Sequence, residues 1–173
     1  YPEDPEILRR LASLEFGAGR YEDAAQRLRL ATELYPEQDE FVYSLGQVLR
    51  ALSDEEGAIL AFGQVDRAHP LYVEARLQIA ILYDEGGHPE QALEEVEALR
   101  VLRPDAGLAR HVATLRVRVG DVKGGVALFE SLLEESPDNE EVLYQLGVLY
   151  GNQNEVDRAL GYMERVLEVN PRN

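Results

Sequence analysis

The sequence predicts an all-α protein built from stacked antiparallel helix pairs, an α-solenoid, and three periodic observations support this. Proline recurs in four steps of thirty-four residues and one of thirty-three, at Pro2, Pro36, Pro70, Pro104, Pro137 and Pro171. Small and large apolar residues keep the same interval, and a turn lies midway between the prolines. A fixed period of this size indicates repeated supersecondary units that pack on their neighbours rather than around one globular core.

The first helix of each unit is predicted from an aliphatic residue followed by a small one. The small residues are Ala12, Gly46, Ala80, Ala113 and Gly147. Apolar residues spaced at i, i+3, i+4 and i+7 form one face of a helix, and a small residue lets a second helix backbone approach closely. We therefore expect each of these small residues at a close contact between helices.

A turn then reverses the chain, and a second helix follows. The turns are Gly19-Arg20, Ser53-Asp54, Gly86-Gly87-His88, Gly120-Asp121 and Asn152-Gln153-Asn154. The second helices carry a small series, Ala24, Ala58, Ala92, Gly125 and Ala159, and four residues later a large one, Leu28, Phe62, Val96, Phe129 and Met163. The proline closes the second helix, because the residue before a proline is disfavoured in helical geometry.

The chain is thus predicted to be a single array over residues 1–173. Its units lie at about 5–38, 39–72, 73–105, 106–139 and 140–173. Charged residues replace an apolar one at Glu15, Arg76 and Arg116, and we expect their stems to lie on the core while their charged heads reach water. The fourth unit carries extra glycines, Gly124 and Gly125 among them, which we interpret as neutral drift, with a hinge as the alternative.

This period and pattern resemble the tetratricopeptide repeat. The fifth unit carries the resemblance best, through Leu143, Leu146-Gly147, Tyr150, Val156, Ala159, Met163, Leu167 and Pro171. The resemblance implies a right-handed superhelix of about ten helices that serves as a protein-interaction scaffold or adaptor. Tyr1-Pro2 matches Tyr35-Pro36, so we expect a fragment of a longer protein. Sixteen arginines against one lysine hint at a bacterial origin.

The resemblance also implies that the first helices line a concave, peptide-binding groove. Our candidates for that groove are Arg9, Arg10, Tyr43, Gln47, Arg50, Gln78, Arg110, His111, Arg118 and Tyr144. A wider set adds Ser13, Phe16, Leu77, Ile81, Thr114, Val117, Gln145, Val148, Ser44, Asp84 and Glu85. Together with the candidates above, this set contains five arginines and two acidic residues.

Arginine and tyrosine are enriched at binding hot spots, and guanidinium groups suit carboxylates. We therefore expect a protein or peptide partner with acidic character. The alternative is that these arginines pair with glutamates on adjacent helices. Another acidic series precedes the candidates by one turn, and we assign it to the helix N-termini. It consists of Glu6, Glu40, Glu74 and Glu141.

Several function classes are disfavoured. A net charge of −16 and a pI near 4.5 argue against nucleic acid as a partner. No apolar run is long enough to predict a membrane span. The chain has no cysteine, and His69, His88 and His111 are not at metal-ligand spacing. We therefore expect no catalytic role, no metal and no cofactor.

Two other functions stay open, as does the compartment. One is self-association through uncapped ends, where Met163, Val166 and Leu167 would be exposed. The other is a regulatory role within a larger multidomain protein. The composition predicts a soluble protein, cytoplasmic by default, with a periplasmic or membrane-anchored full-length protein as the alternative.

Overall fold

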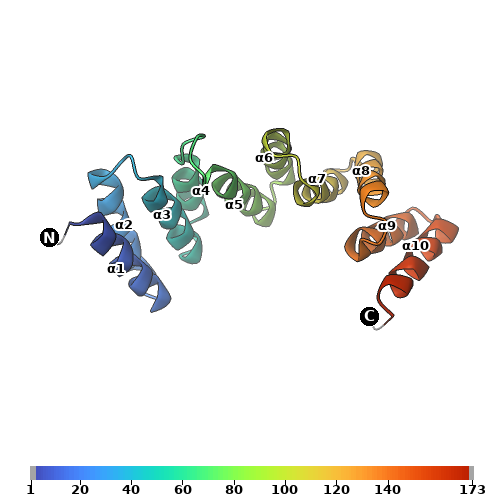
Figure 1. Cartoon of the computed structure of the whole chain (residues 1–173), viewed down its shortest axis with the longest axis horizontal. Coiled ribbons are helices and arrows are strands. Elements are labelled where there is room, and N and C mark those ends of the chain that lie inside the picture. The colour runs from blue at the N-terminus through green and yellow to red at the C-terminus, as the bar shows by residue number, and fades with distance from the viewer. Residues whose placement is uncertain (1–2, 172–173) are drawn as a thin grey trace. The chain divides into compact units, whose positions relative to one another are not determined.

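The computed structural model describes residues 3–171, and these form ten helices and no strand (Figure 1). The helices are α1 Pro5–Gly17, α2 Tyr21–Leu34, α3 Asp39–Ala51, α4 Glu55–Gly63, α5 Tyr72–Glu85, α6 Pro89–Leu102, α7 Ala106–Arg118, α8 Val122–Glu135, α9 Glu140–Asn152 and α10 Val156–Val169. The predicted all-α solenoid is confirmed. The interpretation of Tyr1-Pro2 falls outside the described residues.

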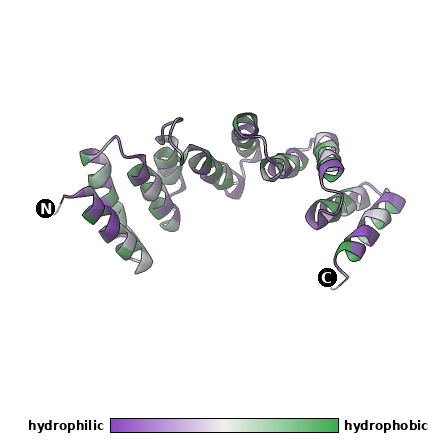
Figure 2. Cartoon of the chain, viewed as in Figure 1, coloured by the Kyte–Doolittle hydropathy of each residue, from purple (hydrophilic) through white to green (hydrophobic). Residues whose placement is uncertain are grey.

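The helices group into two compact units, and the boundary between Glu95 and Val96 falls inside α6. Hydrophobic and hydrophilic residues share each helix, as Figure 2 shows, so every helix has an apolar side to bury. The core of the first unit includes Leu28, Phe41 and Phe62, and that of the second includes Phe129 and Leu143. The predicted bounds of the five repeats stay a prediction.

Left-handed backbone geometry reverses the chain after each odd-numbered helix. The residues with positive φ are Gly19 (72°), Ser53 (59°), Gly87 (79°), Gly120 (91°) and Asn154 (60°). In the turn after α1 the next amide, that of Arg20, donates to the Glu15 carbonyl at 2.8 Å. This bond closes the helix end as a Schellman motif does. All five turns lie where the sequence predicts them.

Close packing between helices occurs where the small residues predict it. A Cβ atom at Gly46 would lie 2.7 Å from the ring of Phe62, which is 1% exposed. In the second unit a Cβ at Gly147 would lie 2.8 Å from Met163 Cε. The small residue of the first helix and the large residue of the second therefore form one interlocking contact.

The helix α4 is shorter than its counterparts. It ends at Gly63, well before Pro70, although we expected the proline to close it. The backbone amide of Asp66 donates to the Asp39 carboxylate at 2.8 Å, and Val65 is buried. These contacts hold the segment that follows α4 against the start of α3.

The charged residues at core positions form ion pairs. Glu15 is only 7% exposed and accepts from Arg27 Nε at 2.8 Å and Arg27 Nη2 at 2.5 Å. The prediction of a solvated head was wrong for Glu15, because its partner lies beside it on α2. Arg76 and Arg116 likewise donate to glutamates of α6, namely Glu95 at 2.5 Å and Glu97 at 2.6 Å.

Apolar residues are exposed on α1 and α10. Ile7, Leu11 and Leu14 are 42%, 37% and 63% exposed, and Leu167 is 56% exposed. Val166 is buried at 6% exposure, so the prediction that it is exposed was wrong. It belongs to the core of the second unit.

Candidate functional site

A hollow of about 240 Å³ lies between α1 and α3 in the first unit. Its polar rim consists of Arg9, Ser13, Ser44 and Gln47, and its apolar lining of Ala12, Phe16, Leu28 and Val48. We call this the α1–α3 hollow. Two candidates from the sequence, Arg9 and Gln47, line it, and so do Ser13, Phe16 and Ser44 of the wider set.

The two arginines of α1 differ in their contacts. Arg9 forms an ion pair with Glu6, one turn earlier on the same helix. Both side chains are more than half exposed, at 56% and 62%. An exposed pair of this kind contributes little to stability, about 0.2–1 kcal/mol, so an incoming carboxylate can compete with Glu6 for Arg9. Arg10, the neighbouring candidate, is exposed.

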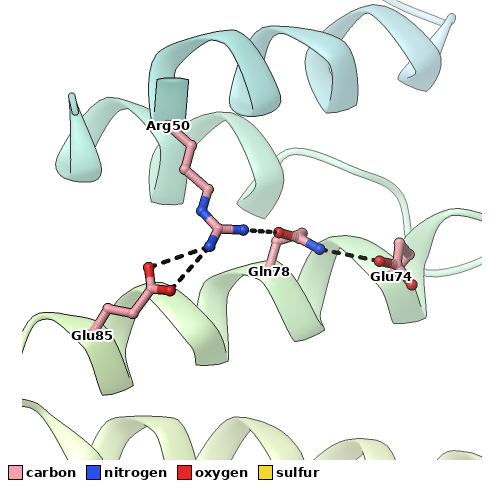
Figure 3. Close-up of polar contacts among 4 residues, drawn as sticks. All are labelled: Arg50, Glu74, Gln78 and Glu85. Atoms are coloured by element: carbon pink, nitrogen blue, oxygen red, sulfur yellow. Dashed lines mark hydrogen bonds and ion pairs between the residues drawn. The ribbon is translucent and has the colours of Figure 1, made fainter. Parts of the chain in front are cut away.

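A polar network links α3 to α5 (Figure 3). Arg50 donates to Gln78 Oε1 at 2.7 Å and to the two carboxylate oxygens of Glu85 at 3.1 and 3.3 Å. Gln78 Nε2 in turn donates to Glu74 at 3.1 Å. The structure therefore brings the candidates Arg50 and Gln78 together, but it occupies both with partners inside the chain.

Tyr43 is half-buried rather than fully presented on the surface. Its ring lies 5.4 Å from that of Phe62, with the two planes tilted by 59°. Burial raises the pKa of Tyr43, and so does the nearby charge of Glu74, while a hydrogen bond with Gln47 lowers it. The tyrosine thus keeps its proton, and much of its ring belongs to the core.

The remaining candidates lie in the second unit. Arg110 forms an ion pair with Glu141 at 2.5 Å and lines a small hollow of about 70 Å³. His111 is half-buried, Arg118 is exposed, and Tyr144 is 51% exposed. These four residues therefore all belong to the second unit.

Three acidic residues that precede the candidates by one turn contact candidate residues. Glu6, Glu74 and Glu141 lie in the first turn of their helices, as expected, and they also pair with Arg9, Gln78 and Arg110. The charges of Arg9, Arg50 and Arg110 are therefore balanced within the chain. The alternative left open by the sequence, pairing with glutamates on other helices, describes Arg50 and Arg110. It does not describe Arg9, whose partner Glu6 lies on the same helix. The spacing of Glu6 and Arg9, three residues apart on one helix, was the signal that sequence reasoning missed.

Residues 3–171 contain neither a metal-binding cluster nor a membrane-spanning helix. No cluster of three or more His, Asp or Glu side chains in this range is arranged to hold a metal ion. Within the same range, no helix is both long enough and apolar enough to cross a bilayer.

The repeat pattern matches known families over most of the chain. Models described as "Tetratricopeptide repeat" match residues 9–73 and residues 117–173. The chain belongs to the tetratricopeptide-repeat (TPR) family. TPR arrays serve as scaffolds for protein–protein interaction, and this chain is a scaffold of that general kind.

Two curated relatives of this chain are much longer than it is. Protein CTR9 homolog of Arabidopsis thaliana is 39% identical over 59 residues, covering 34% of this chain and 5% of the relative. Protein O-mannosyl-transferase TMTC1 of Homo sapiens is 23% identical over 173 residues, covering 96% of this chain and 19% of the relative. The chain therefore spans less than a fifth of either relative.

Solved structures share the fold at low sequence identity. MamA from Desulfovibrio magneticus is 18% identical with a TM-score of 0.79, over 95% of this chain and 94% of that one. YrrB, a TPR protein with an unusual peptide-binding site, is 18% identical with a TM-score of 0.76, over 100% of this chain and 90% of that one. At such identities the comparison concerns the fold alone.

Proposed function

We propose that this TPR array binds a peptide segment of a partner protein in its concave groove, with the α1–α3 hollow taking one apolar side chain of that segment. The observation that carries the proposal is the hollow itself. Five of its lining residues, Arg9, Ser13, Phe16, Ser44 and Gln47, belong to the set that the sequence predicted to face the groove.

The size and lining of the hollow suit a peptide better than a cofactor. Small-molecule pockets usually measure about 300–1,000 Å³, whereas this hollow measures about 240 Å³. Phe16 and Val48 supply apolar contact, while Ser13, Ser44 and Gln47 on the rim can hydrogen-bond a peptide backbone. YrrB, which shares the fold, has a peptide-binding site, and this supports the proposal by analogy.

The rim of the α1–α3 hollow also favours a peptide that carries an acidic residue next to its apolar one. Arg9 pairs with the exposed Glu6, and Arg10 follows it on α1. Arg50 contributes less to this preference, because Gln78 and Glu85 already engage it. We therefore place the acidic specificity at α1 rather than along the whole groove.

The test measures binding of a short fluorescent peptide by polarisation. The peptide carries one Phe among Asp, Glu and Ser residues, and matched peptides replace the Phe by Gly or the acids by Lys. We expect Ser13→Trp, which fills the hollow, and Arg9→Gln each to weaken binding of the acidic Phe peptide by about tenfold.

The control is Arg29→Gln, which makes the same charge change at an exposed position on α2. It should alter affinity by less than about twofold, because Arg29 does not line the hollow and an exposed charge outside the site acts only through a screened field. Unchanged binding in both Ser13→Trp and Arg9→Gln would refute the proposal. Equal losses of affinity in Arg9→Gln and Arg29→Gln would mean that the net charge of the chain, rather than a contact at Arg9, attracts the acidic peptide.

A further inference from the structure

A second hollow, of about 500 Å³, lies in the first unit near the turn that joins α5 to α6. Its walls come from α4, the end of α5, the turn after it and the start of α6. Its main lining residues are Glu55, Glu56, Ile59, Leu60, Tyr83 and His88. It shares no lining residue with the α1–α3 hollow, and we call it the α4 hollow.

Leu60 breaks the repeat pattern at this place. Its side chain is 70% exposed, so the fold gains almost nothing from its apolar character. The corresponding positions of the other repeats hold Gln26, Glu94, Ala127 and Gly161, all polar or small. A single exposed leucine is ordinary. This one stands out because it lines a hollow together with Ile59 and the Tyr83 ring.

The charge around the α4 hollow has one sign. Glu55 and Glu56 line it, no lysine or arginine is among its lining residues, and His88 is its only basic side chain. Both glutamates lie in the first turn of α4, where they also favour the helix dipole. That turn is already capped by Asp54, whose carboxylate accepts from the Gly57 amide at 3.0 Å. The carboxylates are therefore available to an external cation.

We propose that the α4 hollow is a second docking surface, which binds an amphipathic segment of a partner protein carrying a large apolar side chain flanked by lysine or arginine. The apolar side chain would pack on Leu60, Ile59 and Tyr83. The flanking cations would pair with Glu55 and Glu56. An apolar centre with a charged rim is the usual anatomy of a protein interface. This surface differs from the groove in both position and charge preference.

The experiment uses a labelled helical peptide of Leu and Arg, with Leu at i, i+3, i+4 and i+7, titrated with the whole chain. A matched peptide keeps every Arg and replaces the Leu residues by Ser. The test variant Leu60→Gln introduces the residue found at the corresponding position of the first repeat, Gln26, so the fold should tolerate it.

The matched control is Val101→Gln, at an apolar side chain that is 80% exposed on α6 and outside the hollow. Its counterparts in other repeats are Glu33, Arg67, Glu134 and Glu168, so polarity is tolerated there too. Neither substitution changes the net charge. Any difference between the two variants therefore reports contact rather than long-range attraction.

We expect Leu60→Gln to lower the affinity for the Leu–Arg peptide by about tenfold. Val101→Gln should leave that affinity within about twofold of the parent's. Circular dichroism of both variants should match the parent. Equal affinity for the Leu and Ser peptides would overturn the proposal, since attraction to a chain of net charge −16 would then explain all binding. A loss below about threefold in Leu60→Gln would overturn it as well. The Arg9→Gln variant separates this surface from the groove, since it should not affect the cationic peptide.

Discussion

Glu15 and Arg27 occupy two facing positions, on α1 and α2, that other repeats fill differently. The second repeat has Leu49 and Ala61 there, both buried. The fifth repeat has Tyr150 and Tyr162, whose rings stack 5.6 Å apart. Equivalent positions on the two helices of a repeat are therefore occupied by an ion pair, an aliphatic pair or an aromatic stack. Removing one partner of a buried ion pair is costly because the other charge is left unpaired.

We expect Glu15→Leu alone to lower the free energy of unfolding by about 2–3 kcal/mol, because it leaves the Arg27 guanidinium without its carboxylate. The double variant Glu15→Leu with Arg27→Ala has the residue pair of the second repeat. Its free energy of unfolding should lie within about 1 kcal/mol of the parent's, since a buried ion pair contributes little more than apolar residues in its place. Urea denaturation measures both. A double variant as unstable as the single one would show that the pair itself is required.

The same pair should make stability depend on pH in acid. The hydrogen bond from Arg27 lowers the pKa of Glu15 below its ordinary value of 4.5. The unfolded chain therefore takes up this proton first. The stabilisation is fully present above about pH 4.5 and is lost as the pH falls through the lower, folded pKa. The double variant should lack this part of the acid dependence in urea titrations.

Tyr150 gives a matching prediction in alkali. Burial, followed by the hydrogen bond to Glu130 and the charge of that carboxylate, raises the pKa of Tyr150 from 10.0 to about 12. Its hydroxyl donates to Glu130 Oε1 at 2.6 Å. Since the folded pKa is the higher one, the stabilisation is present below pH 10 and is lost as the pH rises towards 12. Tyr150→Phe should flatten this decline in urea denaturation, whereas the exposed Tyr144→Phe should not.

At the scale of the helices, the contact between a small residue and a large one sets how closely each pair packs. Gly46 meets the rigid ring of Phe62, while Gly147 meets the flexible side chain of Met163. Replacing glycine by alanine inside a helix favours folding by about 1 kcal/mol, and overpacking a core costs about 1–3 kcal/mol. The balance of these two effects should therefore differ between the two positions.

We expect Gly46→Ala to destabilise the protein by about 1–2 kcal/mol, because a buried aromatic ring has no free space to move into. Gly147→Ala should be close to neutral, within about 0.5 kcal/mol, because Met163 can change rotamer. Thermal and urea denaturation of the two variants provide the comparison. Equal effects at both positions would mean that the ring of Phe62 moves as freely as the thioether of Met163.

The sequence predicted helices and turns better than side-chain partners. The turns were predictable because the left-handed geometry at Gly19 and Gly87 depends on local chemistry. The early end of α4 at Gly63 was missed, since we relied on Pro70 as the stop signal. The pairing of Arg50 with Glu85 was missed as well. Those residues lie thirty-five positions apart, and their contact exists only once α3 and α5 are packed.

For the whole molecule, the two compact units raise the question of how far stability is shared along the array. Stability in repeat proteins is roughly a sum of terms for each repeat and its neighbours, so local damage should stay local. Gly125 offers a way to damage the second unit alone. A Cβ there would lie 2.8 Å from the Ala113 carbonyl oxygen and 2.5 Å from a methyl of Val117. The interpretation of this glycine as neutral drift was therefore wrong, because the backbones of α7 and α8 meet at it.

We expect Gly125→Ala to destabilise the second unit by about 1–3 kcal/mol, because a backbone carbonyl cannot move aside as a side chain can. Hydrogen exchange followed by mass spectrometry should show faster exchange in α7, α8 and α9, with α1 to α4 unchanged. The control is Gly161→Ala on α10, where a Cβ would meet no atom within 4 Å. That change should slow exchange slightly, since alanine favours the helix. Equally faster hydrogen exchange in α1 to α4 and in α7 to α9 would instead mean that the chain opens as a single cooperative body. The two compact units would then not unfold independently.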